Sequence, residues 1–265
     1  MRNTKNNMSF WSIPFTARKI FFGIVTCAIV TVSCKHEPIR LPVVMYEDAV
    51  TDYDGNSYDA VVIGDQLWMA SNLKSTHYAD GTPIPAGNES DISDTLPYRY
   101  APGGIEENVE AMGRLYNWAA VMHGSRHSND APSGVQGICP DGWHVPSNTE
   151  WRQLTDNIQN NEYYMEYSLS IGKALAAMSG WDSSRVYHSV GNDQRRNDAT
   201  GFCAIPAGYF VFGSYSDIGQ FAYFWTTMRS SLHFGAGRAI GYNTTEAAAC
   251  ESSLYYGLSV RCVKD

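Results

Sequence analysis

Apolar positions recur along the chain with two periods, and each period predicts a different kind of element. Short apolar runs broken by turn residues occupy 58–69, and apolar and polar residues alternate over 258–263, as in β-strands. Over 114–123 the apolar residues instead recur at i, i+3, i+4 and i+7, which is the spacing of one helix face. Strands near both ends with helices between them predict an α+β fold in which the two ends meet in one sheet.

The stretch 139–151, Cys-Pro-Asp-Gly-Trp-His-Val-Pro-Ser-Asn-Thr-Glu-Trp, specifies a turn followed by a helix start. Ser147 and Glu150 form a capping-box pair: the serine oxygen accepts an amide of the first turn, and the glutamate accepts the cap amide. We therefore expect a helix to begin at this serine. A second short helix is expected over 171–178, and a hairpin turn over 52–56.

The first 33 residues have the pattern of an export signal. They carry four basic residues and no acidic one, and their apolar run at 20–32 is shorter than the roughly 20 residues that span a bilayer. Small residues directly before Cys34 are typical of a bacterial lipobox. We expect Cys34 to carry a lipid, 34–45 to form an extended tether and 46–265 to form one domain. An ordinary signal peptide cut elsewhere, or an uncleaved anchor, is the alternative.

The charge balance narrows the class of partner. After the signal the chain keeps 15 of its 19 Lys and Arg residues and all 27 Asp and Glu residues, a net charge of −12. Nucleic acids and anionic lipid headgroups both require a basic face, so neither is an expected partner. The expected contact with the membrane is through the N-terminal lipid. The simplest meaning of the acidity itself is solubility.

Four cysteines remain after the signal and the lipid attachment site: Cys139, Cys203, Cys250 and Cys262. An exported protein meets an oxidising compartment, so an even number suggests disulfides, but spacing does not choose among three pairings. A zinc site is the rival, yet there is no Cys-x-x-Cys and no His at ligand spacing from a Cys. The turn 52–56 superficially resembles a calcium loop, but its Gly comes too early and the closing Glu is missing. We expect no metal and no cofactor.

Blocks of sequence over 52–265 resemble, in the same order, those of the Fibrobacter succinogenes major paralogous domain. The blocks are Asp54-Gly-Asn56, Ile63-Gly-Asp-Gln-Leu-Trp68-Met69-Ala-Ser-Asn72-Leu73, Gly113-Arg-Leu-Tyr-Asn-Trp118, the stretch 139–151, Gly201-Phe-Cys-Ala-Ile-Pro-Ala-Gly208, Tyr223-Phe-Trp225 and Gly257-Leu-Ser-Val-Arg-Cys262-Val-Lys-Asp265. The resemblance implies an exported bacterial protein, often a lipoprotein. It also implies a C-type lectin-like fold, with two or three helices, a small twisted antiparallel sheet and long loops.

The same resemblance implies a pairing of the cysteines. Cys139 and Cys262 fall in the recurrent Cys-Pro and Arg-Cys blocks, so a bridge between them would tie the helix region to the last strand. Cys203 stands where the family usually has a small residue, and Cys250 lies outside any block. Two cysteines added together suggest a second bridge, Cys203–Cys250.

The resemblance and the loop composition favour a binding module at the cell surface, for a glycan or a protein. Aromatic rings can stack on sugar faces, and Asp and Arg can bond hydroxyls. The expected ligand surface lies within 189–233, and its candidate residues are Tyr215, Asp217, Arg195 and Arg229. The alternative is that most of these aromatics fill the core. The Glu-Pro-Asn or Gln-Pro-Asp loop of calcium-dependent sugar lectins is missing, which argues against that mode of binding.

Two other functions remain open. The chain is equally compatible with a structural or fimbrial-assembly component of the envelope, with the outer membrane as the expected location in either case. Residues 145–151 also resemble a block of formylglycine-generating enzymes, but the context that those enzymes require is missing around Cys250 and Cys262. No Gly-x-Ser-x-Gly or His-Glu-x-x-His motif is present, so we expect no enzyme. Glu150 is explained as a cap, and His144 has no assigned role.

Overall fold

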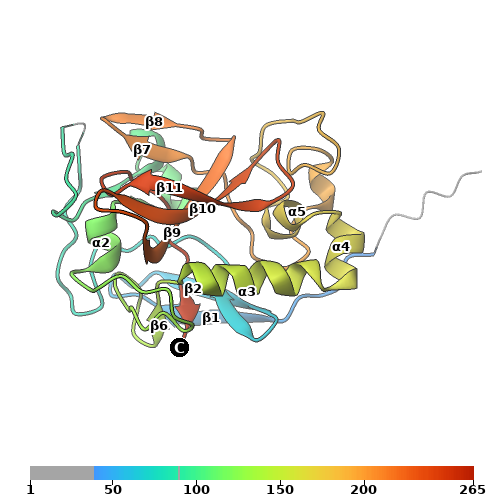
Figure 1. The fold of residues 1–265 in the computed structure, drawn as a ribbon, viewed down its shortest axis with the longest axis horizontal. Helices are drawn as coiled ribbons and strands as arrows, with labels where there is room; N and C mark the ends of the chain where they lie inside the picture. Colours follow the sequence, from blue (N-terminus) through green and yellow to red (C-terminus); the bar gives the residue numbers. More distant parts are fainter. Residues whose placement is uncertain (1–38, 89) are drawn as a thin grey trace, which may run out of the picture. The chain divides into compact units, whose positions relative to one another are not determined.

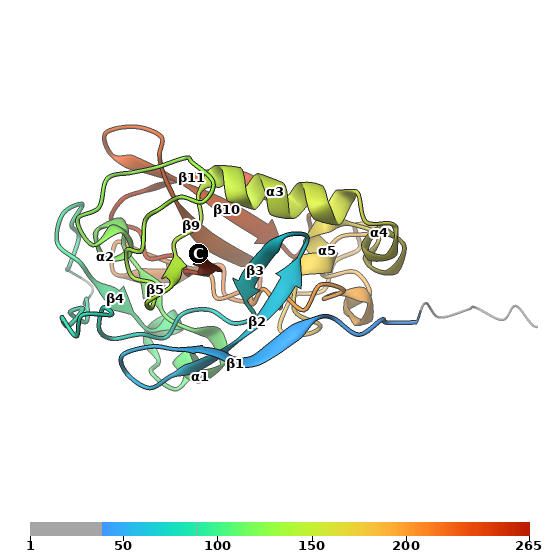
Figure 2. The same cartoon turned by 90° about the horizontal axis from the view of Figure 1, so that it is seen from below.

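In the computed structural model, which describes residues 39–88 and 90–265, strands from the beginning and the end of this described part lie in one sheet (Figure 1). The sheet has the order β1-β2-β3-β12-β6, and its paired neighbours are antiparallel. Its strands are β1 Met45–Thr51, β2 Ser57–Ile63, β3 Gln66–Met69, β6 Trp143–His144 and β12 Val263–Lys264. The predicted signal 1–33 and Cys34 lie outside the described residues. Figure 2 shows β1, β2 and β3 side by side.

Two tight turns connect the first three strands. The predicted hairpin turn 52–56 joins β1 to β2, and Gly55 takes a left-handed φ of 82° there. Asp52 Oδ1 accepts the backbone amide of Asn56 at 2.9 Å and so closes the turn. Residues 64–65 join β2 to β3. Local turn chemistry therefore sets this part of the sheet, as the sequence predicts.

A second, three-stranded antiparallel sheet has the order β11-β10-β9. Its strands are β9 Phe221–Arg229, β10 Phe234–Gly241 and β11 Ala247–Ser253. One face packs on α3 (Asn148–Gln159): Phe224 and Ile240 share a buried cluster with Trp151 of the helix. The alternate residue Trp225 belongs to a different cluster, on the other face. Figure 1 shows α3 on one side of this sheet and the strands β7 (Tyr209–Val211) and β8 (Ser214–Ser216) on the other.

The helix start predicted at Ser147 is confirmed. Ser147 Oγ accepts the amide of Glu150 at 3.1 Å, and Glu150 Oε2 accepts the amide of Ser147 at 2.8 Å, which completes the capping box. The buried face of α3 then repeats every three or four residues, through Trp151, Leu154 and Ile158.

The remaining helices are short, and the sequence predicts their bounds less accurately. They are α1 Asn108–Met112, α2 Trp118–Met122, α4 Glu162–Ser168 and α5 Ile171–Leu175, with 3₁₀ turns η1 Pro102–Gly104 and η2 Gln194–Arg196. The helix predicted over 114–123 starts late because Asn117 caps it and accepts the amide of Ala120 at 3.1 Å. The residues before that cap form β5 (Leu115–Tyr116), paired with β4 (Arg99–Tyr100). Helix α5 ends before the predicted 178.

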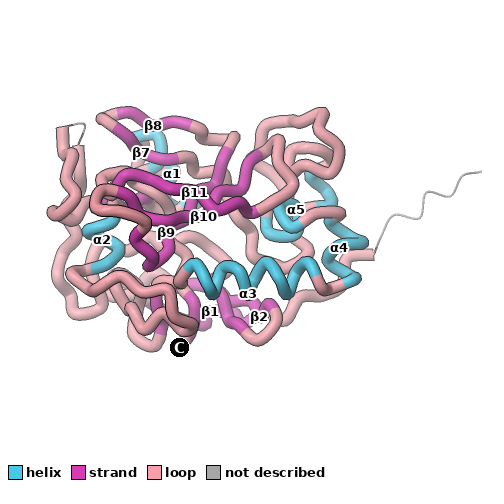
Figure 3. Tube along the Cα trace, in the orientation of Figure 1, coloured by secondary structure: helices cyan, strands magenta, loops and turns pink. Residues whose placement is uncertain are grey.

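Long loops make up much of the domain, as Figure 3 shows for the segments on either side of α2. The segment predicted as a tether is partly bound to this domain. Arg40 Nη2 donates to Asp198 Oδ2 at 2.9 Å, and the amide of Leu41 donates to the Tyr163 hydroxyl at 2.6 Å. None of the helices in the described part of the chain is long and apolar enough to span a bilayer.

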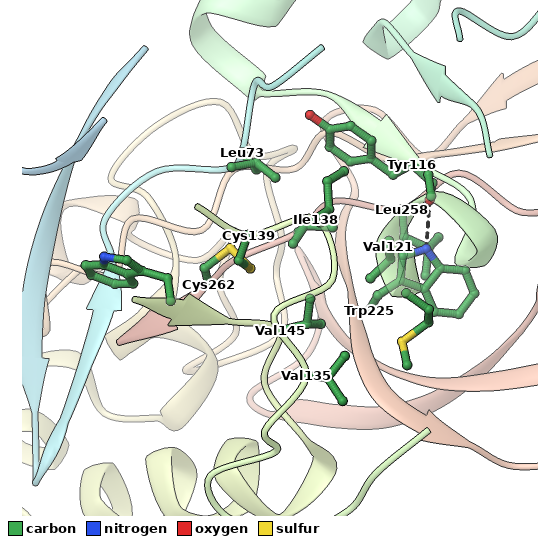
Figure 4. Close-up of a cluster of buried hydrophobic side chains, with 14 of the residues drawn as sticks. Leu73, Tyr116, Val121, Val135, Ile138, Cys139, Val145, Trp225, Leu258 and Cys262 are labelled. Atoms are coloured by element: carbon green, nitrogen blue, oxygen red, sulfur yellow. Dashed lines mark hydrogen bonds between the residues drawn. A yellow bond between two sulfur atoms is a disulfide. The ribbon is translucent and has the colours of Figure 1, made fainter. Parts of the chain in front are cut away.

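One of the two predicted disulfides is confirmed. Cys139 and Cys262 are bonded, with their Cα atoms 6.0 Å apart, and both lie in a buried cluster (Figure 4). The predicted Cys203–Cys250 bridge is wrong: both side chains are free thiols. Cys203 lies near the buried guanidinium of Arg261, whereas Cys250 belongs to β11. The two added cysteines serve different parts of the fold, so their joint addition did not indicate a pair.

Candidate binding surface

The four residues predicted to bind a ligand lie on different elements. Tyr215 belongs to β8 (Ser214–Ser216), and Asp217 follows it directly. Arg195 belongs to η2 and forms an ion pair with a neighbouring aspartate at 2.9 Å. Arg229 is the last residue of β9. Of the four, Asp217 has a hydrogen bond to Tyr223, whose ring belongs to a surface group of six neighbouring aromatic side chains.

Six aromatic rings lie in contact one after another, and we call this row the aromatic strip. In order along the row they are Phe212, Tyr255, Tyr256, Tyr209, Tyr223 and Phe221. Consecutive ring centroids are 5.1, 5.2, 5.6, 5.3 and 5.5 Å apart, the separations of offset or edge-to-face pairs. Phe212 is 61 % exposed, and the other five rings are partly exposed. The strip therefore offers aromatic surface to solvent over its length.

Three segments place these rings. Phe221 and Tyr223 alternate along β9 with residues that face α3, so both point away from the helix. Strand β7 (Tyr209–Val211) and the turn after it supply the rings at 209 and 212. The segment after β11 supplies the rings at 255 and 256, and it is held beside β7 because Phe210 and Gly257 exchange two backbone hydrogen bonds.

The β10 strand leaves room for one end of the strip. Gly241 lies opposite Phe221 in the sheet register. A Cβ atom at Gly241 would lie 2.5 Å from Phe221 Cε1, so any side chain there would displace the ring. Glycine at this position thus allows the ring to lie over the neighbouring strand.

Phe212 occupies an unusual backbone conformation at the tip of the β7–β8 hairpin. Its φ is 47° and that of Gly213 is 75°, and the residues that flank this two-residue turn are paired. Left-handed backbone is uncommon for a bulky residue, and Asn-Gly is the usual choice for such a turn. A conformation of this type costs on the order of 1–3 kcal/mol, and it often marks a functional position. A large apolar side chain is therefore held in solvent where a small polar one would be more stable.

The strip is uncharged apart from Asp217 beside it. The Tyr223 hydroxyl donates to Asp217 Oδ2 at 2.8 Å. Burial, together with this hydrogen bond and the nearby negative charge, raises the pKa of Tyr223. Burial also raises the pKa of Cys250 to about 11, so the cysteine near this tyrosine is a neutral thiol. The surface therefore combines flat apolar faces with neutral hydroxyl groups.

The stretch 139–151, which brings Cys, His and Glu together in sequence, forms part of the framework. His144 Nε2 lies 2.7 Å from Glu150 Oε1, and His144 Nδ1 lies 2.7 Å from Asp265 Oδ1. Burial opposes the charge on His144, but the hydrogen bonds and charges of both carboxylates outweigh it and raise its pKa. Both ring nitrogens face carboxylates, which accept only, so the geometry calls for the imidazolium form. His144 thus joins α3 to the last strand.

Residues that resembled a calcium loop also have structural partners. Asp52 accepts hydrogen bonds from the Tyr58 hydroxyl at 2.7 Å and the Ser75 hydroxyl at 2.6 Å. Asp54 accepts the backbone amides of Thr76 and His77. Within 39–88 and 90–265, no group of three or more His, Cys, Asp or Glu side chains is arranged to hold a metal ion.

The aromatic strip overlaps only in part with 189–233, the segment in which the sequence predicts the ligand surface. Its aromatic candidate, Tyr215, is not one of the six rings and packs on Phe210, with ring centroids 5.2 Å apart. Alternation along β9 separates Phe221 and Tyr223 from the buried Phe224, and this signal was present in the sequence. The contribution of 255–256 was not visible, because it depends on a long-range pairing.

Comparison with known protein families gives one match. The profile of the Fibrobacter succinogenes major domain (Fib_succ_major) matches residues 61–264, which is more than half of the chain. No match is found among curated proteins or among solved structures.

Proposed function

The chain belongs to the Fibrobacter succinogenes major domain family, and from that premise we propose that it is an exported, lipid-anchored binding module of the cell envelope that holds a glycan chain on the aromatic strip. The signal-like N-terminus and Cys34 support export and anchoring. The α+β arrangement, with the first and last described strands in one sheet and long loops, supports a C-type lectin-like fold.

The aromatic strip carries the proposal. Its six rings contact one another in sequence and each is at least partly exposed, so together they form an extended aromatic surface. It suits a narrow, extended ligand with repeated flat apolar faces. Sugar rings present such faces and surround them with hydroxyls, which the tyrosine hydroxyls and Asp217 can bond. The strained Phe212 would supply the outermost stacking surface.

A glycan array of the mature protein tests the proposal, with Phe212→Ala and Tyr255→Ala combined in one variant. Removing two stacking rings, at about 1 kcal/mol each, should weaken binding to any positive glycan by about tenfold or more. Tyr187→Ala is the matched control, because Tyr187 is 76 % exposed and lies outside the strip. Absence of any glycan signal would contradict the proposal. Equal binding by the double variant and by the Tyr187→Ala control would also contradict it. Protein partners captured from envelope extract without sugar binding would favour the assembly function instead.

A further inference from the structure

A pocket lies apart from the residues of the strip. This pocket of about 450 Å³ is bounded by α2, by the loop at Asp94 and by the end of the β9–β10 hairpin. Its buried apolar lining comes from Trp118, Met122 and Leu254, which are 7 %, 3 % and 1 % exposed. Leu232 at its edge is 71 % exposed. A volume of this size lies within the range of small-molecule sites.

Arg229 also lines this pocket, and its guanidinium is held in place by its own hairpin. Arg229 Nε donates to the carbonyl oxygen of Ser231 at 2.9 Å, and Nη2 donates to that of Leu232. These bonds use two of the five N–H donors of the group, which leaves three. Within the described residues, no carboxylate lies at ion-pair distance from Arg229. The acidic side chain that lines the pocket, Asp94, lies 3.0 Å from His233 Nδ1.

Another arginine shows what a purely structural guanidinium looks like in this fold. Arg261 is fully buried, and all of its nitrogens donate to protein oxygens, including Asn72 Oδ1 and the carbonyl of Met69. Arg229, by contrast, is fixed by a few bonds at the rim of a pocket and keeps donors for a further acceptor. A positioned guanidinium with free donors is suited to bidentate recognition of a carboxylate.

We propose that the Arg229 pocket binds a ring-bearing carboxylate, whose ring lies on the floor of Trp118, Met122 and Leu254 and whose carboxylate accepts hydrogen bonds from Arg229. The apolar floor takes a ring-sized body, and the thioether of Met122 adapts to its shape. The unpaired cation selects the anionic group. An acidic sugar and an aromatic acid share this chemistry. The inference does not depend on glycan binding by the aromatic strip.

NMR titration of the mature protein tests this site with two carboxylates and their neutral counterparts. The pairs are glucuronate with glucose, and phenylacetate with phenylethanol. We expect at least one carboxylate to bind saturably, and to bind about tenfold or more tightly than its neutral counterpart. Binding should weaken as salt rises, since the pocket is open to solvent. Glucuronate alone would identify acidic sugars as the source, and phenylacetate alone would identify aromatic acids.

Variants separate the role of the guanidinium from that of the pocket. Arg229→Gln should lower carboxylate affinity about tenfold and abolish the preference over the neutral compound. Arg229→Lys keeps the charge but loses the fork, so it should fall between the native protein and Arg229→Gln. Arg152→Gln, at an exposed arginine of α3 outside the pocket, is the control and should bind as the native protein does.

Three results would overturn the inference. The first is that neither carboxylate binds. The second is that both bind no better than their neutral counterparts. The third is that Arg229→Gln binds as tightly as the native protein. If Arg229→Gln fails to fold, as judged by circular dichroism, the affinity of Arg229→Lys decides the question.

Discussion

The two faces of the β9–β10–β11 sheet use the same kind of residue for opposite purposes. Phe224 points to α3 and packs with Trp151, their ring centroids 5.3 Å apart, out of contact with solvent. Its neighbour Tyr223 points to the other face, where its ring joins the partly exposed strip. Aromatic content alone therefore does not distinguish core from binding surface. The distinction comes from how far each ring is covered: Phe224 is closed off beneath α3, whereas the rings of the strip stay partly exposed although some of them pack on a buried cluster.

The largest expected effect comes from a matched pair of substitutions in one strand. Phe224→Ala should lower the free energy of unfolding by about 3–5 kcal/mol, because it leaves a cavity under α3. Phe221→Ala, three residues earlier on the strip face, should lower it by only about 1 kcal/mol, since its ring is already partly in water. Urea denaturation measures both. Equal losses would mean that the strip is a second core and would end the comparison.

The next effect concerns the disulfide that joins Cys139, ahead of α3, to Cys262, next to the last strand. Replacing Cys139 and Cys262 together by Ala should cost about 2–5 kcal/mol, because the bridge restricts a long segment of the unfolded chain. Cys250→Ala, on the strip side, should change stability by less than about 1 kcal/mol, because no bridge is lost. Thermal unfolding of the oxidised proteins distinguishes the two. A large loss from Cys250→Ala would show that this thiol has a structural partner.

The pH dependence of stability tests the contact of His144 with Glu150 of α3 and with Asp265. Its pKa is raised in the folded protein, so its contribution is fully present below the unfolded value of about 6.5 and is lost as pH rises through the folded pKa. At pH 6, His144→Gln should cost about 1–3 kcal/mol, because Glu150 and Asp265 lose a shared cationic donor. The difference between the two proteins should shrink on raising the pH. A constant difference across pH would mean that His144 is neutral in the fold.

The smallest effect should have the opposite sign. Phe212→Asn gives the β7–β8 turn the Asn-Gly sequence that its backbone favours, so we expect a gain of about 0.5–1 kcal/mol in stability. The same change removes the outermost ring of the strip and should weaken glycan binding. Differential scanning calorimetry and the glycan array together check the two signs. A loss of stability would show that Phe212 is retained for packing on Tyr255.

Sequence reasoning succeeded where the signal was local. The capping box at Ser147 and Glu150 and the turn at 52–56 each depend on neighbouring residues, and both are confirmed. The Cys139–Cys262 bridge followed from family blocks. Helix α4 was missed although Asn161 caps it, accepting the amide of Tyr164 at 3.1 Å.

What the sequence did not reveal depends on long-range packing. The strip needs the segment after β11 to return beside β7, and the Arg229 pocket needs α2 to lie against the β9–β10 hairpin. Neither of these long-range contacts is indicated by residues that are close together in the sequence. Cys203 and Cys250 were paired because both depart from the cysteine positions of the family blocks, and only the fold shows that they have different surroundings.

Those two thiols give the protein a pair of internal reporters. Burial raises the pKa of Cys203 and of Cys250, so each reacts slowly with an alkylating reagent while its surroundings stay closed. Cys203 follows Phe202, which packs on Trp151, whereas Cys250 lies near Tyr223 of the strip. Their alkylation rates would therefore measure how often the surroundings of each thiol open, and no dye or tag has to be introduced. A ligand that settles on the strip should slow the labelling of Cys250 and leave that of Cys203 unchanged.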